Sequence, residues 1–159
     1  MAFLLHQIVD QSAERAPASE AIRFSGQTLT YEALALESDR LARVLVEEGV
    51  QRGDRVGLYL GKGPASVIGL YGIMKAGAAY VPLDPGAPVA RTAFVLNDCG
   101  ICVVITEEAR VPALRQMLSD GVGLECAIGI DPQEDLGLRT VSWSDVAAAP
   151  SVRERPRAM

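Results

Sequence analysis

Residues 101–105, Ile101-Cys102-Val103-Val104-Ile105, form an unbroken apolar run and point most directly to the fold class. A strand with one face in water alternates apolar and polar residues, whereas a strand of a parallel sheet is covered on both faces and is apolar throughout. The apolar spacing on either side of this run, over residues 88–98 and 108–119, is typical of helices. The local pattern predicts a buried strand between two helices.

The alternation of strands and helices extends in both directions from this run. Strands are predicted at residues 55–60, 79–82, 101–106, 124–130 and 138–141. Helices are predicted at residues 64–76, 88–98 and 108–119, with a last turn at 143–148 capped by Ser142. Successive strand–helix–strand units form a parallel sheet with right-handed crossovers. The predicted fold class is α/β, with a doubly wound, mostly parallel sheet flanked by helices.

A smaller unit is predicted before the first of these strands. An amphipathic helix over residues 2–15 precedes a small hairpin, which turns at Ser25-Gly26. Thr30 is a good N-cap for the helix expected over residues 31–48, because its side-chain oxygen can accept a hydrogen bond from the first helical turn.

Residues 63–83 are apolar enough to be compared with a membrane span, because Lys75 is their only charged residue. Their glycines and prolines, and a change of period halfway, predict a buried helix followed by a buried strand instead. Gly69 and Gly72 each cost about 1 kcal/mol in a helix interior. Close approach of this helix to the sheet would explain both glycines. No membrane span is expected.

Length and composition are typical of one globular domain. The chain has 159 residues, 49% of them hydrophobic and 22% charged, and its net charge is −5. The negative charge argues against a nucleic-acid partner and against an anionic membrane surface. Residues 1–10 have no signal-peptide pattern, so the expected location is the cytoplasm, with reduced cysteines. Residues 1–149 hold all predicted elements, and residues 150–159 are predicted to be a linker or frayed tail.

Two short motifs are candidates for chemistry, but an ordinary explanation is favoured for each. Gly61-Lys62-Gly63 lies between a strand and a helix, where phosphate loops occur, but it lacks the remaining positions of either known phosphate-loop pattern. Cys99-Gly100-Ile101-Cys102 is a C-x-x-C pattern, but Cys99 ends a predicted helix, where the dipole raises a thiol pKa. We favour a strand-to-helix turn for the first motif, and a helix end plus a core thiol for the second.

The remaining polar candidates do not define a site either. His6 is the only histidine and lies on the peripheral first helix, where a structural role is expected. Asp54, Asp84 and Asp98 all lie at element ends, and turn formation explains them. Asp84 follows a strand at the edge where open α/β sheets bind ligands, so it remains the more interesting of the three. The residues alone predict no catalytic and no metal site.

One longer motif is more specific, namely Lys75-Ala76-Gly77-Ala78-Ala79-Tyr80-Val81-Pro82-Leu83-Asp84-Pro85. It resembles the early KAGAAYVPLDP motif of the adenylate-forming superfamily, which comprises nonribosomal peptide synthetase adenylation domains, acyl-CoA synthetases and luciferases. Three further segments resemble family motifs in the same order and spacing: Leu29-Thr30-Tyr31-Glu32-Ala33-Leu34, Gly53-Asp54-Arg55-Val56 and Asn97-Asp98-Cys99-Gly100.

The resemblance implies a two-step reaction for the complete enzyme. ATP, with Mg²⁺, and a carboxylate give an acyl-adenylate, and the acyl group then passes to a thiol of CoA or of a carrier protein. Fatty, aryl and amino acids all remain open as substrates, although the wording Tyr80-Val81-Pro82-Leu83-Asp84 is commonest in amino-acid-activating members. The chain start directly before the first helix is more typical of a free-standing ligase.

The chain also departs from the family. The Ser/Thr/Gly-rich phosphate loop, the adenine and substrate segments and the C-terminal domain of the family have no counterpart in residues 1–159. The resemblance therefore implies an N-terminal part of an adenylation domain, inactive alone, whose partner is the rest of that domain. The motif residues imply scaffold roles, with no catalytic or cofactor-binding role: Lys75, Ala76, Gly77, Tyr80, Pro82 and Asp84. The alternatives are a non-catalytic interaction module that retained the scaffold and a C-x-x-C redox protein.

Overall fold

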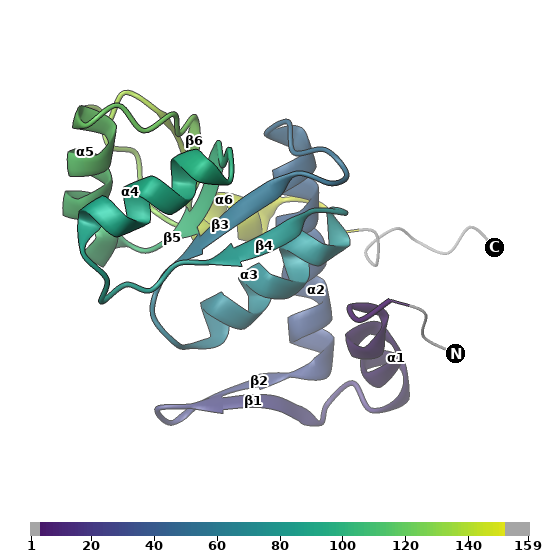
Figure 1. Cartoon of the computed structure of the whole chain (residues 1–159). Coiled ribbons are helices and arrows are strands. Elements are labelled where there is room, and N and C mark those ends of the chain that lie inside the picture. The colour runs from purple at the N-terminus through teal and green to yellow at the C-terminus, as the bar shows by residue number, and fades with distance from the viewer. Residues whose placement is uncertain (1–3, 152–159) are drawn as a thin grey trace.

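The structure is a computed structural model that describes residues 4–151 (Figure 1). Its centre is a sheet of five parallel strands in the order β4-β3-β5-β6-β7. The strands are β3 (Arg55–Tyr59), β4 (Ala79–Pro82), β5 (Val103–Thr106), β6 (Cys126–Ile128) and β7 (Arg139–Val141). The chain moves from β3 to β4 in one direction and then crosses to β5 on the opposite side of β3. The predicted doubly wound α/β fold is confirmed.

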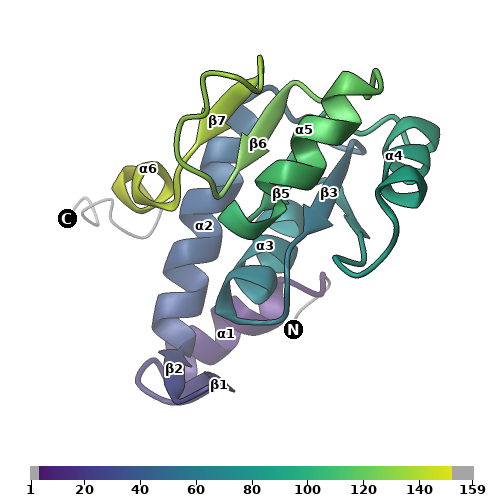
Figure 2. The same cartoon turned by 90° about the vertical axis from the view of Figure 1, so that its left-hand side faces the viewer.

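Helices cover both faces of this sheet, and each face has its own apolar core (Figure 2). One face packs against α2 (Tyr31–Glu47), α3 (Pro64–Lys75) and α6 (Trp143–Ala148). The other packs against α4 (Val89–Asp98) and α5 (Val111–Ser119). Because side chains alternate along a strand, Leu58 of β3 joins the first core and the adjacent Tyr59 joins the second.

The N-terminal unit lies beside α2 and α3. It contains α1 (Gln7–Arg15) and the antiparallel hairpin β1 (Glu20–Phe24) and β2 (Gln27–Thr30). The Thr30 side chain accepts a hydrogen bond from the backbone N–H of Ala33, so the predicted N-cap of α2 is confirmed. The Ser142 cap of α6 is confirmed in the same way.

The two glycines of α3 allow two different close approaches. A Cβ at Gly69 would lie 2.6 Å from Leu58 Cδ1 of β3, as close approach to the sheet requires. A Cβ at Gly72 would lie 2.7 Å from Leu41 Cδ2. The second glycine therefore serves the contact between α3 and α2, which the prediction from sequence did not include.

Several predicted elements are shorter in the structure, and for three of them there is a boundary to explain. The first helix begins at Gln7 instead of residue 2, and residues 1–3 lie outside the described part. Residues 108–110 form the short 3-10 helix η1 (Glu108–Arg110) ahead of α5, because Pro112 has no N–H for a regular helical bond. The strand predicted at 124–130 is reduced to β6, since Gly129 turns the chain at φ 107°.

The prediction that residues 63–83 are buried throughout was wrong for the strand. β4 pairs only with β3 and forms one edge of the sheet, and Ala79, Tyr80 and Pro82 are exposed. α3 is mostly half-buried. None of the helices within residues 4–151 is both long and apolar enough to cross a membrane. The predicted tail at 150–159 falls outside the described residues from 152 onward, and Ser151 is buried.

Candidate functional site

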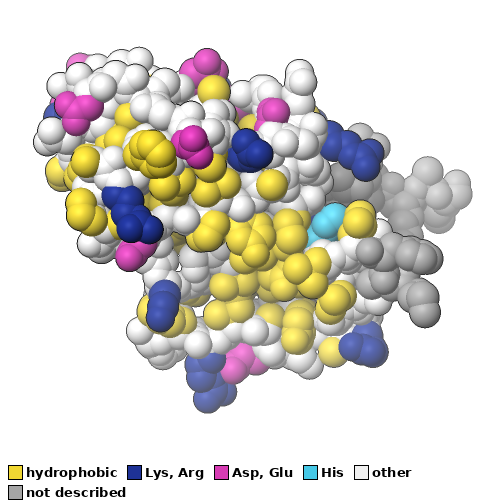
Figure 3. Space-filling view, in the orientation of Figure 1, with side chains coloured by type: hydrophobic (Ala, Val, Ile, Leu, Met, Phe, Trp, Pro, Cys, Tyr) yellow, Lys and Arg dark blue, Asp and Glu magenta, His cyan; other side chains and the backbone are white. Residues whose placement is uncertain are grey.

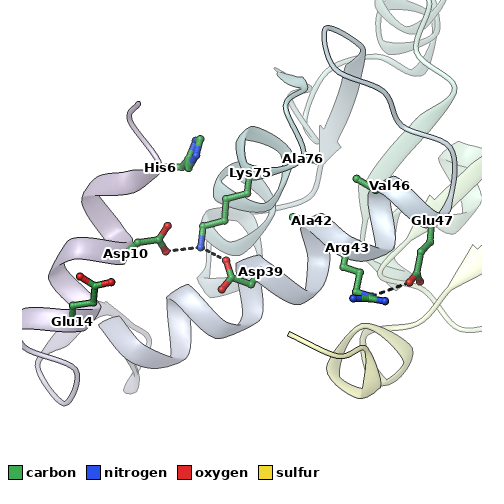
Figure 4. A pocket seen from close by; sticks show the side chains of 10 residues that line it. All are labelled: His6, Asp10, Glu14, Asp39, Ala42, Arg43, Val46, Glu47, Lys75 and Ala76. Carbon is green, nitrogen blue, oxygen red and sulfur yellow. Dashed lines mark hydrogen bonds and ion pairs between the residues drawn. The ribbon is translucent and has the colours of Figure 1, made fainter. Parts of the chain in front are cut away.

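Lys75, the first residue of the long motif, connects three helices (Figure 4). Its Nζ lies 2.9 Å from Asp10 Oδ1 on α1 and 2.6 Å from Asp39 Oδ1 on α2, and it donates to the Ala35 carbonyl at 3.2 Å. The Lys75 side chain is only 7% exposed. The cation is thus enclosed by acceptors from the protein itself.

The rest of the motif forms the end of α3, β4 and the turns on either side. Ala76 is the C-cap of α3, and Gly77 follows it at φ 82°, the left-handed conformation that ends many helices. Asp84 Oδ1 accepts a hydrogen bond from the backbone N–H of Gly86 at 2.8 Å. This is the turn-forming geometry that we favoured for Asp84.

The carboxyl edge of the sheet, between β3 and β5, is where ligands bind in open α/β folds. Here a side chain of the protein occupies that position. The backbone N–H of Gly61, just after β3, donates to Glu107 Oε1 at 2.9 Å. Arg110 Nε lies 3.6 Å from the same carboxylate oxygen. The backbone N–H of Gly61 is therefore already engaged with an internal carboxylate, which also forms an ion pair with Arg110.

The segment around η1 also holds the loops after the neighbouring strands. Glu108 Oε1 accepts from the backbone N–H of Asp131 at 2.6 Å, after β6. Arg110 Nη1 donates to the Pro85 carbonyl at 3.0 Å, after β4. One short segment thus connects the loops that follow β3, β4 and β6. We name residues 107–110 the edge clamp.

This geometry does not fit a triphosphate at Gly61-Lys62-Gly63. Besides the Gly61 N–H, the N–H of Gly63 is engaged, because it donates to Ser66 Oγ at the start of α3. An incoming phosphate would also meet the negative charge of Glu107. Among residues 4–151, no group of three or more His, Cys, Asp or Glu side chains could hold a metal ion. We therefore derive no nucleotide or metal chemistry from the described residues.

The structure separates the three cysteines and corrects one expectation. Cys102 was predicted to be a core thiol, but it is exposed, because β5 begins one residue later at Val103. Cys126 of β6 is the buried thiol. Burial, and then the nearby Glu48 carboxylate, raise the pKa of Cys126 to about 12. A thiol with so high a pKa is not a nucleophile at neutral pH.

The remaining candidates are dispersed. His6 is half-buried immediately before α1. Asp54 closes a turn by accepting from the backbone N–H of Gln51 at 2.8 Å, and Asp98 ends α4. The sequence reasoning missed Glu107 and Asp39. A pair of glutamates directly after a predicted strand was the only available signal for the edge clamp.

Comparison with known proteins identifies the family. A family model described as AMP-binding enzyme matches residues 9–158. Tyrocidine synthase 3 of Brevibacillus parabrevis is 37% identical over 134 residues, which is 84% of this chain and 2% of that protein. Surfactin synthase subunit 2 of Bacillus subtilis is 41% identical over 64% of this chain and 3% of its own length.

Solved structures agree in fold. The chain matches the anthranilate CoA ligase AuaEII, in complex with anthranoyl-AMP, with a TM-score of 0.81 at 24% identity, over 91% of this chain and 28% of that one. It matches the nonribosomal peptide synthetase FmoA3, bound to α-methyl-L-serine-AMP, with a TM-score of 0.74 at 31% identity, over 98% of this chain and 16% of that one.

The fold and these matches define the class of protein as an AMP-binding enzyme. The chain belongs to the AMP-binding enzyme family, as the four motifs predicted, and it corresponds to a small part of the longer proteins that it matches.

Proposed function

We propose that this chain is the N-terminal scaffold segment of an ATP-dependent ligase that activates a carboxylic acid as an acyl-adenylate. The acyl group then passes to the thiol of CoA or of a carrier protein. The family match over residues 9–158 carries this proposal. Two matched structures contain acyl-adenylates of an aryl acid and of an amino acid, which are the substrate classes that the proposal allows.

Within this proposal the segment is inactive alone and binds no cofactor by itself, whereas the complete enzyme uses ATP and Mg²⁺. The carboxylate of Glu107 at the Gly61 N–H supports this division, because it occupies the edge where a phosphate would need free donors. The motif residues Lys75, Ala76, Gly77, Tyr80, Pro82 and Asp84 then shape the scaffold. The proposed location is the cytoplasm, and no nucleic acid is a partner.

ATP–pyrophosphate exchange tests the proposal. The chain alone, with a broad panel of fatty, aryl and amino acids, should give no exchange above a protein-free control. Addition of the complementary part of the AMP-binding domain of tyrocidine synthase 3 should restore exchange. Exchange by the chain alone would contradict inactivity, and failure of restoration would count against the scaffold role.

A non-catalytic interaction module is the second candidate. It is favoured by the exposure of large apolar side chains near the N-terminus, where Leu4 is 55% and Leu5 59% exposed. Exposed apolar surface of this kind marks association sites. A stable monomer that neither binds the complementary part nor restores exchange would support this candidate.

A further inference from the structure

A groove of about 790 Å³ lies between α1, α2 and the end of α3 (Figure 4). With the histidine neutral, four carboxylates and two cations in its lining leave a formal charge of −2: Asp10, Glu14, Asp39, Glu47, Arg43 and Lys75. The groove is therefore an acidic surface, with carboxylates on the α1 side and on the α2 side.

Two of the four carboxylates present oxygens to solvent. Asp10 and Asp39 share the enclosed ammonium of Lys75. Glu14 is exposed and forms no ion pair with any residue between 4 and 151. The Glu47 side chain contacts a neighbouring arginine on α2, yet it is still 56% exposed. Glu14 and Glu47 are thus the two positions in this groove where an added cation can bind.

The described chain ends beside this groove. Pro150 lines a hollow of about 280 Å³ at the end of α6, and Glu47 lines both this hollow and the groove. Ser151, which follows, is only 3% exposed, so the chain is held against the protein up to this point. Figure 1 shows the last described residues and α1 to the right of α2. The chain therefore leaves the described part at the Glu47 end of the groove.

The groove is short enough for residues 152–159 to cross. Glu47 and Asp39 lie two turns apart on α2, which is about 12 Å along its axis. Asp39 contacts the same ammonium as Asp10, and Glu14 follows Asp10 by one turn of α1, about 6 Å. Eight extended residues span about 26 Å, which covers this path from Glu47 to Glu14.

The sequence of residues 152–159 carries the complementary charge. Its three arginines and one glutamate give a formal charge of +2, and the arginines occupy alternate positions: Arg153, Arg155 and Arg157. In an extended segment, alternate residues share one face, so Glu154 would point away from that face. Pro156 favours such a conformation, because the residue before a proline is restricted to extended backbone.

We propose that residues 152–159 bind in this groove as an extended segment, with Arg153 at Glu47 and Arg157 at Glu14. The inference goes beyond the proposed function and does not depend on it. A guanidinium can donate two parallel hydrogen bonds to a carboxylate. Because both carboxylates are exposed, each pair is weak by itself and is screened by salt. Binding in this groove connects the end of α6 to α1 across α2.

The neighbouring surfaces suit a basic segment less well. The face that carries β4 and α3 is largely apolar (Figure 3), and the charged residues that line its groove, Arg52 and Lys75, are cations. The hollow at the end of α6 contains two further carboxylates, but both are engaged. Glu48 pairs with an arginine of β7, and Asp145 accepts from the N–H of the α6 N-cap residue at 3.1 Å.

Limited proteolysis of the full chain tests the inference. Trypsin cleaves after arginine, and a bound arginine is not accessible to it. A synthetic peptide of residues 148–159 gives the cleavage rate of the unbound sequence. At about 10 mM salt, cleavage after Arg153 and Arg157 should be about fivefold slower in the chain than in the peptide. At about 1 M salt, where charges are screened within about 3 Å, the two rates should be equal.

Charge-reversal variants identify the partner carboxylate, and circular dichroism checks that each variant is folded. Glu14→Lys places a cation where Arg157 binds and should bring cleavage within about twofold of the peptide rate. Glu134→Lys makes the same charge change in the exposed loop before β7 and should leave the protection in place. Glu14→Lys combined with Arg157→Glu restores opposite charges and should restore the protection of Arg153.

Three results would overturn the inference. Cleavage of the full chain at the peptide rate in low salt would mean that the segment is not bound. Protection that survives Glu14→Lys, or that survives about 1 M salt, would mean that another surface holds the segment. Protection that rises with the concentration of the chain would assign the groove to the segment of a second copy.

Discussion

Lys75 Nζ and Asp39 Oδ1 lie 2.6 Å apart, and this contact joins the last residue of α3 to the middle of α2. Asp10 of α1 completes the ion pair from the other side. One ammonium group thus links three helices that also pack through apolar side chains.

Lys75→Met should destabilise the fold. The substitution keeps the apolar stem but removes the buried ammonium that pairs with Asp10 and Asp39, at a cost of about 3 kcal/mol. Urea unfolding followed by circular dichroism measures the free energy of unfolding. Arg43→Met is the matched control, because its pair with Glu47 is exposed and contributes less than about 1 kcal/mol. Equal losses for the two variants would contradict the role assigned to Lys75.

Gly129→Ala adds only one methyl group, but it should strongly lower the stability of the fold. At φ 107° an added Cβ would lie 2.2 Å from the Thr106 carbonyl oxygen, so the backbone after β5 or β6 must move. We expect a loss of about 3 kcal/mol or more, from the clash and the left-handed conformation together. Gly123→Ala has open space around its Cβ and should lie within about 0.5 kcal/mol of the parent chain. Thermal unfolding of both variants decides the question.

Alkaline pH should destabilise the folded chain through Cys126. Its pKa is about 12 in the folded state, above the ordinary value of 9.0, so the folded state keeps a proton that the unfolded state releases. This stabilisation is complete below pH 9 and is lost as pH rises toward 12, by about 1.4 kcal/mol for each pH unit. Urea midpoints between pH 8 and 10.5 measure the slope.

Two variants isolate the thiol responsible. Cys126→Ala should reduce the alkaline loss of stability, whereas Cys102→Ala, which removes an exposed thiol, should leave the slope unchanged. An unchanged slope in Cys126→Ala would assign the alkaline transition to other groups.

Glu107→Ala should weaken the carboxyl edge of the sheet. It leaves the Gly61 N–H without its acceptor and removes the carboxylate that forms an ion pair with Arg110, at a cost of about 1 kcal/mol. Glu107→Gln keeps an acceptor oxygen and should lose about half as much or less. Amide exchange at Gly61 provides the local readout, and it should be faster in the alanine variant only.

The elements predictable from sequence were those set by local patterns. The caps at Thr30 and Ser142 depend on residues a few positions apart, and the structure confirms them. The strand predicted at 101–106 is confirmed over residues 103–106. The edge position of β4 was not predicted from the sequence. The order of strands in a sheet depends on which strands pair with one another, and the residues of a single strand do not reveal it.

The contacts at the site were beyond prediction for the same reason. Glu107 meets Gly61 across 46 residues of sequence, and Lys75 meets Asp10 across 65. No local spacing signals such a pair. The wrong prediction that Cys102 is a core thiol had a different origin. An apolar run indicates that a strand is present, but the first residue of β5 is set by where the neighbouring strand β6 begins to pair with it.

The edge clamp has a consequence for exchanging parts between relatives. The loops after β3, β4 and β6 each attach to the clamp through a backbone group, at Gly61, Pro85 and Asp131. A graft that lengthens one of these loops would pull on an anchor shared with the other two. The loops after β3, β4 and β6 should therefore be exchanged between relatives as one unit, together with residues 107–110.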